Sequence, residues 1–270
     1  MQAMLLAAGF GTRLRPYTLV RPKPLFPVCN IPLLHILLDK LITLGCDRIV
    51  VNCHYLAEQI KAAVADRAKV ILQHESEVLG TGGGLRKALE HFHDGPVLVM
   101  NGDIFHDIDL SRLITAHTAG NDAVTLALHD YPRFNSVVVR QGRVQKFSTA
   151  KEGENILAFT GIHVVNREIL KQIPLNCFFH IIDLYKELSG TGKIGYTRTD
   201  GSFWQDMGTP DDYLDLHRHL LSSQTPSWQI HESAGIGKNV ELKGWGAIGP
   251  GAVIGDEAQL ARCVIWDGAQ

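Results

Sequence analysis

Several features that would place this 270-residue chain in a specialised class are missing from its sequence. It has no charge-free run of about twenty apolar residues, so we expect no transmembrane helix. No basic segment accompanies its apolar start, which argues against a signal peptide and favours a cytoplasmic protein. Its five cysteines are odd in number and form no C-x-x-C pair. We therefore expect reduced structural thiols rather than a disulfide framework or a metal site.

The sequence also lacks an excess of either charge. It has 26 Lys and Arg against 28 Asp and Glu, for a formal net charge of −2. This balance provides no broad basic surface for nucleic acid or for an anionic membrane, although a local basic site is compatible with it. With 45% hydrophobic and 20% charged residues, the chain has a globular composition and is long enough for one large domain or two ordinary ones.

The first hundred residues alternate short apolar runs with amphipathic runs of helical length. Strands are expected at residues 3–7, 48–52, 69–73 and 96–100, and helices at 32–44, 55–66 and 84–93. This order predicts βαβ units and a Rossmann-like, mainly parallel α/β sheet. Ligands of such sheets bind at the carboxyl ends of the strands, so the loops there are the expected site.

From residue 122 the sequence becomes richer in β-forming residues. Strands are expected at residues 124–128, 136–140, 143–147 and 156–165, and the turn Gln141-Gly142 predicts a hairpin inserted beside the sheet. Helices are expected at residues 179–188 and 211–221.

Near the carboxyl end, apolar residues recur every six positions. They are Ile236, Leu242, Ile248, Ile254, Leu260 and Trp266. Such hexads are typical of a left-handed parallel β-helix, in which one aliphatic residue per short strand points inward. We therefore expect an α/β domain over residues 1–221, a linker over 222–230 and a short left-handed β-helix segment over 231–270.

A glycine turn follows the first expected strand, at Gly9-Phe10-Gly11-Thr12-Arg13. Such a turn lets backbone N–H groups face a phosphate chain, and the adjoining arginine can add a charge-assisted grip. A dinucleotide fingerprint would need glycine where Leu14 stands, and a Walker A loop would need Gly-Lys-Ser/Thr, which is absent. Judged by its spacing alone, the glycine turn fits a purely structural role as well as it fits phosphate binding.

The longer string Leu6-Ala7-Ala8-Gly9-Phe10-Gly11-Thr12-Arg13-Leu14, with Lys23-Pro24-Leu25, resembles the signature of sugar-1-phosphate nucleotidyltransferases. Four further motifs follow in the order of that family: Leu79-Gly80-Thr81-Gly82-Gly83-Gly84, Asn101-Gly102-Asp103, Phe159-Thr160-Gly161-Ile162 and Trp204-Gln205-Asp206-Met207-Gly208-Thr209-Pro210. The resemblance covers residues 1–221, and the hexad segment is similar to the C-terminal β-helix of many family members.

The resemblance implies a reaction in which an NTP and a sugar 1-phosphate give an NDP-sugar and pyrophosphate, with Mg²⁺ as cofactor and a mannose- or glucose-type sugar favoured. Arg13 would hold the β- and γ-phosphates, Lys23 would lie near the α-phosphate, and Asp103 and Asp206 would bind Mg²⁺. The implied nucleotide-binding residues are Leu6, Ala8, Gly9, Gly11, Thr12, Gly80, Thr81 and Gly82. The implied sugar-binding residues are Lys151, Thr160 and Gly161.

The chain departs from the family before the strand at 156–165, because the usual Glu-Lys-Pro is replaced by Ala150-Lys151-Glu152-Gly153-Glu154. Lys151 therefore fits a solvent-exposed run of charged residues as well as it fits a sugar-binding role. Two other functions stay open: a choline- or alditol-phosphate cytidylyltransferase, and a catalytically silent subunit that binds an NDP-sugar. The expected partners are the NTP and the sugar 1-phosphate, without nucleic acid or membrane, and a homo-oligomer is left open.

Two other residue patterns could suggest metal binding but are better interpreted as ordinary structural features. Asp107-Ile108-Asp109 could imitate a D-x-D metal motif, but Asp109 is better placed to cap a helix that begins at Leu110. The pairs His91/His93 and His217/His219 have i,i+2 spacing, which does not bring two side chains to one helix face.

Overall fold

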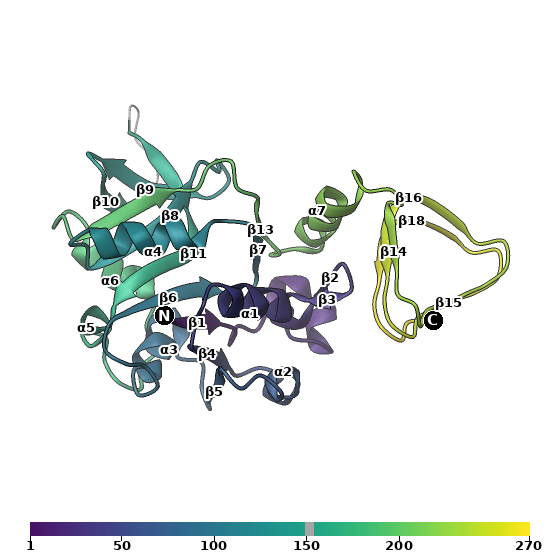
Figure 1. Ribbon diagram of the computed structural model, residues 1–270, viewed down its shortest axis with the longest axis horizontal. Coiled ribbons are helices and arrows are strands. Elements are labelled where there is room, and N and C mark those ends of the chain that lie inside the picture. Colours follow the sequence, from purple (N-terminus) through teal and green to yellow (C-terminus); the bar gives the residue numbers. More distant parts are fainter. Residues whose placement is uncertain (149–153) are drawn as a thin grey trace. The chain divides into compact units, whose positions relative to one another are not determined.

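The computed structural model describes residues 1–148 and 154–270, which form two compact units (Figure 1). The first unit contains Met1–Phe10 and Leu37–Trp204, and the second contains Gly11–Ile36 and Gln205–Gln270. Each unit therefore combines segments that are distant in the sequence. The chain passes from the first unit to the second between Phe10 and Gly11, within the predicted phosphate loop.

A nine-stranded sheet with the order β5-β4-β1-β6-β11-β8-β12-β10-β9 forms the centre of the first unit. Its first four strands are parallel, as predicted: β1 (Gln2–Leu6), β4 (Arg48–Cys53), β5 (Val70–His74) and β6 (Pro96–Asn101). These strands are short aliphatic runs, which suit a sheet covered on both faces. The helices that connect them are α1 (Leu33–Thr43), α2 (Ala57–Val64) and α3 (Gly80–Ala88).

The rest of the sheet is mixed, so the prediction of a mainly parallel sheet was wrong for this half. Strand β11 (Ile156–Asn166) runs antiparallel to β6 on one side and to β8 (Val124–His129) on the other. Strand β12 (Ile194–Arg198) returns parallel to β8. The strand β11 follows a hairpin rather than a crossover helix, and antiparallel pairing needs no crossover.

The predicted hairpin is present but belongs to the main sheet. It consists of β9 (Asn135–Arg140) and β10 (Arg143–Phe147). Its turn residues Gln141 and Gly142 have φ of 52° and 73°, the positive values that a type I′ turn requires. Because β9 also pairs with β11, the strands β11, β8, β12, β10 and β9 close on themselves.

Helices on the faces of the sheet complete the first unit's core. Helix α4 (Leu110–Ala119) packs on β8, β11 and β12, and α3 packs on α6 (Ile181–Leu188) and α5 (Arg167–Leu170). The predicted cap is confirmed, because the Asp109 carboxylate accepts hydrogen bonds from the N–H groups of Ser111 and Arg112. Two short strands, β7 (Ile104–His106) and β13 (Trp204–Asp206), were not predicted.

The second unit begins with a proline-rich segment that forms three 3₁₀ turns, η1 (Thr12–Leu14), η2 (Tyr17–Leu19) and η3 (Lys23–Leu25), and the strands β2 (Pro27–Val28) and β3 (Ile31–Pro32). Prolines lack the N–H group that a continuous helix needs, which explains the short turns. Helix α7 (Pro210–Leu221) starts with Thr209 as its cap, since the Thr209 hydroxyl accepts a hydrogen bond from Asp212 N–H.

The hexad segment of the second unit forms stacked parallel strands, shown in yellow in Figure 1. They are β14 (Trp228–Ile230), β15 (Gly235–Ile236), β16 (Glu241–Ile248), β17 (Val253–Ile254) and β18 (Gln259–Ile265). Ile236 pairs with Ile254, and Lys238 N–H donates to the Asp256 carboxylate. The residues of each pair are 18 positions apart, so one coil contains three hexads. Ile248, Ala252 and Ile254 are buried between the strands.

Two of the six hexad residues do not lie inside this coil. Ile236 is 40% exposed. A register shift between Lys243 and Gly246 pairs Ile248 with Ile265, so Ile265 packs against the interior and Trp266 points elsewhere. The Trp266 ring instead lies 4.7 Å from the Phe26 ring, and its Nε1 donates to the Tyr213 hydroxyl. The hexad period thus correctly located the strands. The register shift, however, removes Trp266, the last hexad residue, from the interior of the coil.

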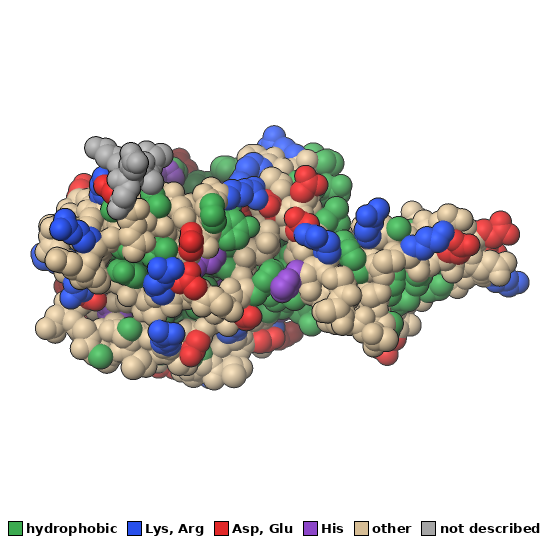
Figure 2. Space-filling view, turned by 90° about the horizontal axis from the view of Figure 1, so that it is seen from above, with side chains coloured by type: hydrophobic (Ala, Val, Ile, Leu, Met, Phe, Trp, Pro, Cys, Tyr) green, Lys and Arg blue, Asp and Glu red, His purple; other side chains and the backbone are tan. Residues whose placement is uncertain are grey.

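Charged side chains of both signs lie on the surface (Figure 2), and two of the five cysteines are buried. On the face seen in Figure 2, positive and negative side chains are interspersed. The five cysteines are free, and burial raises the pKa of Cys29 and of Cys53 to about 11. Across the residues that the structure describes, no helix is both long and apolar enough to cross a membrane.

Candidate functional site

The loop after β1 lies at the carboxyl end of the parallel half of the sheet. Ala7 and Ala8 are buried, whereas Gly9 is open, with no atom within 4 Å of the place where a Cβ would stand. Phe10 packs against His54 with ring centres 5.3 Å apart. The first unit therefore presents the backbone of residues 8–9 at the sheet edge where α/β proteins bind ligands.

The glycine run at the start of α3 is explained by close packing on residues 177–181. A Cβ on Gly80 would lie 2.7 Å from the Phe179 carbonyl oxygen, and one on Gly83 would lie 2.4 Å from that of Cys177. The N–H groups of Gly82 and Gly83 both donate to the Phe179 carbonyl oxygen. The predicted helix at 84–93 was wrong in position, because these glycines are themselves helical and α3 ends at Ala88.

Thr81 lies within this glycine run. Its hydroxyl oxygen accepts a hydrogen bond from Ile181 N–H at 3.0 Å. The predicted nucleotide-binding residues Gly80, Thr81 and Gly82 thus form the first turn of α3, with their backbone tied to one neighbouring segment. Leu79 N–H is also held, by the Glu75 carboxylate at 3.2 Å.

Asp103 is held in a tight turn after β6. The preceding Gly102 donates its N–H to the Leu6 carbonyl oxygen at 2.9 Å, and a Cβ on Gly102 would lie 2.9 Å from that same oxygen. The turn is therefore fixed beside the end of β1, and Asp103 is half-buried there. Asp107 is engaged differently, since its carboxylate accepts a hydrogen bond from Phe203 N–H.

The predicted sugar-binding residues lie on β11. The Thr160 side chain is buried and donates to the Ala127 carbonyl oxygen at 2.8 Å, while the Thr160 carbonyl accepts from the Trp204 indole at 2.9 Å. Gly161 has φ of 76°, and a Cβ there would lie 2.6 Å from the Asn101 amide nitrogen. Lys151 lies outside the described residues.

An aromatic cluster adjoins Thr160 and was not predicted. The rings of His129, Tyr131 and Phe134 stack in sequence, and Trp204 packs edge-on against all three. The His129 pKa is lowered by burial, so its imidazole is neutral at physiological pH. Aromatic residues are common in cores, and the sequence carried no spacing signal for this cluster.

The second unit brings together Arg13, Lys23 and Asp206. Lys23 Nζ lies 3.1 Å from one Asp206 oxygen, and Arg13 lies 3.8 Å from the other. The Lys23 side chain is 7% exposed and that of Arg13 is 63% exposed, so the two cations differ in their access to solvent.

Two glycines shape the surroundings of these charges. A Cβ on Gly208 would lie 2.7 Å from the Asp206 carboxylate and 2.8 Å from the Arg13 guanidinium. Gly11 has φ of 62°, and its carbonyl accepts from the Thr18 hydroxyl at 3.0 Å. Arg13, Lys23 and Asp206 sum to one positive charge, an arrangement suited to an anionic ligand.

Most histidines have structural partners. His217, for example, donates from Nδ1 to the Tyr213 carbonyl and accepts from Cys29 N–H. Burial lowers the pKa of His106 to about 3. Within residues 1–148 and 154–270, no group of three or more His, Cys, Asp or Glu side chains is placed to hold a metal ion.

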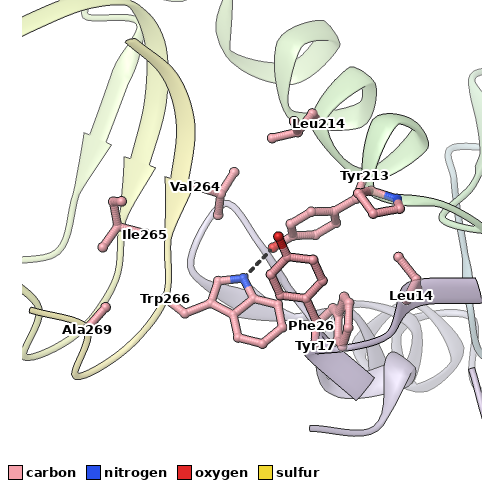
Figure 3. Close-up of a pocket in the computed structure, with 10 residues that line it drawn as sticks. Leu14, Tyr17, Phe26, Tyr213, Leu214, Val264, Ile265, Trp266 and Ala269 are labelled. Carbon is pink, nitrogen blue, oxygen red and sulfur yellow. Dashed lines mark hydrogen bonds between the residues drawn. The ribbon is translucent and has the colours of Figure 1, made fainter. Parts of the chain in front are cut away.

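The second unit also contains an apolar pocket of about 330 Å³ (Figure 3). Its lining residues are Leu14, Tyr17, Phe26, Pro210, Tyr213, Leu214, Val264, Ile265, Trp266 and Ala269. The hydrogen bond from Trp266 to Tyr213 crosses it at 3.1 Å. An apolar lining does not suit phosphate groups.

The chain is similar to known proteins in sequence and in fold. The family model described as nucleotidyl transferase matches residues 2–223. Mannose-1-phosphate guanylyltransferase of Mycobacterium tuberculosis is 29% identical, with 100% of this chain and 81% of that protein aligned. Mannose-1-phosphate guanylyltransferase 1 of Arabidopsis thaliana is 30% identical, with 100% of this chain and 79% of that protein aligned. The crystal structure of HddC from Yersinia pseudotuberculosis complexed with GMP-PN shares the fold, with a TM-score of 0.68, 24% identity, and 80% and 97% of the two chains covered.

We predict that Gly83→Ala destabilises the protein even though alanine is the better helix former. Inside an exposed helix the change would gain roughly 1 kcal/mol. Here the new Cβ would meet the Cys177 carbonyl oxygen at 2.4 Å, and relieving such overpacking costs about 1 to 3 kcal/mol. Urea unfolding measures the difference, with Gly255→Ala as control because nothing lies within 4 Å of that position. Unchanged or raised stability of Gly83→Ala would contradict this packing.

Proposed function

Because the chain belongs to the nucleotidyl transferase family, we propose that it transfers the nucleotidyl group of an NTP to a sugar 1-phosphate and releases pyrophosphate. The observation that carries this proposal is the cluster of Arg13, Lys23 and Asp206, in which residues 11–36 and residues 205–210 meet within the second unit. It supplies local positive charge for a polyanionic ligand in a protein whose overall charge is close to zero.

The proposed chemistry is in-line attack by a phosphate oxygen of the sugar 1-phosphate on the α-phosphorus. The bond from the α-phosphorus to the bridging oxygen breaks, and that oxygen leaves with the β- and γ-phosphates as pyrophosphate. Such a reaction depends on alignment and charge stabilisation. Arg13 is exposed, so its guanidinium is accessible to grip the leaving phosphates in bidentate fashion. Lys23 is buried and paired with Asp206, which suits a fixed charge near the α-phosphate.

Asp103 is the residue that we propose for Mg²⁺. It offers one hard carboxylate from a fixed, half-buried turn, which fits an ion that takes few protein oxygens and completes its shell with phosphate oxygens and water. When bound, Mg²⁺ would neutralise phosphate charge. The role of Asp206 as a second ligand stays a prediction, and its ion pairs give it a further role of orienting Lys23 and Arg13.

For the substrates, we propose GTP and a mannose-type sugar 1-phosphate as the first candidates, because the relatives described above are named mannose-1-phosphate guanylyltransferases. The backbone of Leu6, Ala8 and Gly9 and the first turn of α3 would contact the base and ribose. Gly11 and Thr12 would contact the phosphates. Gly161 and the backbone of Thr160 would meet the sugar, because the Thr160 hydroxyl is already engaged with Ala127.

We also propose that residues 1–221 act as the catalytic domain and residues 228–270 as a short left-handed β-helix. The linker expected at 222–230 shortens to 222–227, because β14 already pairs with β16. The parallel strands, their 18-residue spacing and the buried Ile248 and Ile254 support the β-helix assignment. A β-helix of this kind offers stacked strand edges, which is compatible with a homo-oligomer.

The proposal predicts that pyrophosphate forms only when an NTP and a sugar 1-phosphate are both present. Five NTPs would be tested against mannose and glucose 1-phosphates, and against phosphocholine, with pyrophosphate as the readout. We expect GTP with mannose 1-phosphate to give the highest kcat/KM. Turnover confined to CTP and phosphocholine would instead identify a cytidylyltransferase, and NDP-sugar binding without any turnover would identify a silent subunit.

A second prediction concerns the carboxylate in the turn after β6. Asp103→Ala should lower kcat by about 100-fold or more, because charge stabilisation in the transition state is lost, and the thermal midpoint should hardly change. Asp109→Ala is a matched control: it removes a helix cap at a cost of about 1 kcal/mol in stability and should leave kcat unaltered. Wild-type turnover by Asp103→Ala would remove Asp103 from the metal site.

A further inference from the structure

Three parallel strands of the first unit end side by side, and two of them, β4 and β5, carry a polar residue near that end. The register pairs Leu6 of β1 with Asn52 of β4, and Asn52 with Gln73 of β5. Glu75 follows β5 directly. None of Asn52, Gln73 and Glu75 was singled out by its sequence, because isolated polar residues after strands are common in loops.

These side chains form one buried hydrogen-bond network. Asn52 Oδ1 accepts from Ala7 N–H at 2.8 Å, and Asn52 Nδ2 donates to Glu75 Oε1 at 2.8 Å. The other Glu75 oxygen accepts from Leu79 N–H at 3.2 Å. A single carboxylate thus connects the loop after β1 with the residue immediately before Gly80.

The same network explains the last glycine of the run in α3. A Cβ on Gly84 would lie 2.8 Å from Glu75 Oε1 and 2.9 Å from Asn52 Nδ2. Gln73 closes the network, since its Nε2 donates to the Gly84 carbonyl at 3.0 Å and to Glu75 Oε1 at 3.3 Å. The start of α3 therefore packs directly on the carboxylate and the amide.

The network is buried. Asn52 is 2% exposed and Glu75 is 1% exposed, so water cannot replace a lost partner easily. Because Asn52 Nδ2 faces the Glu75 carboxylate, Asn52 Oδ1 must face the Ala7 N–H. Glu75 thereby fixes the orientation of the amide that holds the loop.

We propose that Asn52 and Glu75 are positioning residues that set the separation between the loop at residues 6–9 and the start of α3. This proposal rests on the proposed function, in which these two segments contact the base and ribose of the NTP. The two residues act through Ala7 and Leu79 rather than by touching the substrate themselves. Their loss should weaken binding of the NTP without affecting the sugar 1-phosphate.

The test compares Asn52→Leu with Asn166→Leu in the full chain. Asn166 is a matched control, because it is also an asparagine at a strand end of the same unit. Its side chain bridges the His117 ring and the Asp122 carbonyl oxygen. Calorimetry with GTP and Mg²⁺ gives the dissociation constant directly, and kinetics give both KM values. We expect Asn52→Leu to raise the GTP dissociation constant and KM by about 10- to 100-fold, with the KM for sugar 1-phosphate within about twofold.

Exchanging the charged and neutral side chains at positions 52 and 75 keeps the proposal testable if Asn52→Leu fails to fold. Asn52→Asp places two carboxylates together, and Glu75→Gln in the same chain restores a donor facing an acceptor at the contact between positions 52 and 75. The double variant should recover most of the GTP affinity that Asn52→Asp loses. Gly84→Ala, which presses on the same two atoms from α3, should reproduce the GTP defect.

The outcomes separate this proposal from the function on which it rests. If the wild type binds GTP without forming pyrophosphate and Asn52→Leu weakens that binding, the positioning role stands and the proposed reaction fails. If the wild type turns over and Asn52→Leu matches Asn166→Leu in GTP affinity and in both KM values, the positioning role is overturned. Equal loss of affinity for GTP and sugar 1-phosphate, without rescue in the double variant, would also overturn it.

Discussion

A buried lysine needs a carboxylate beside it, and the Lys23 ion pair with Asp206 is the contact on which the second unit depends. The two residues are 183 positions apart, and their 3.1 Å contact joins the proline-rich segment to the strand that precedes α7. Removing one partner of such a buried pair costs about 3 to 5 kcal/mol, because the remaining charge stays out of water. The same contact holds Lys23 in place while Arg13, on the opposite oxygen, stays exposed. The stability of the second unit and the proposed binding of phosphate therefore depend on one set of charges.

Close approach of backbone is the second constraint, and it explains the glycines better than flexibility does. Gly83, Gly84, Gly102 and Gly208 each stand where a Cβ would meet a carbonyl oxygen or a functional side chain within 3 Å. At Gly83 and Gly84 the neighbours differ, one a backbone carbonyl and the other the Asn52–Glu75 network. A run that would suggest a loose loop is in fact the tightly packed first half of a helix.

Local patterns predicted the parallel half of the sheet, because its strands are short aliphatic runs separated by amphipathic helices. They also predicted the hairpin at Gln141-Gly142 and the Asp109 cap, since both depend on residues a few positions apart. They failed for β11, whose antiparallel partners are distant in sequence, and for Trp266, which a bulge near Gly246 moved out of the hexad register. Arg13 stood out beside the glycine turn, whereas Lys23 stood out only through the longer motif. The roles of Asn52 and Glu75 depend on strand register, which a single sequence does not reveal.

The central claim is that the nucleotidyl group, rather than the terminal phosphate, moves to the sugar 1-phosphate. The most direct test follows the fate of phosphorus label in the product, with NTP labelled at either the α- or the γ-position. The account predicts that α-label appears in the nucleotide sugar and that γ-label appears in pyrophosphate. Recovery of γ-label on the sugar, or as free phosphate without nucleotide sugar, would contradict it.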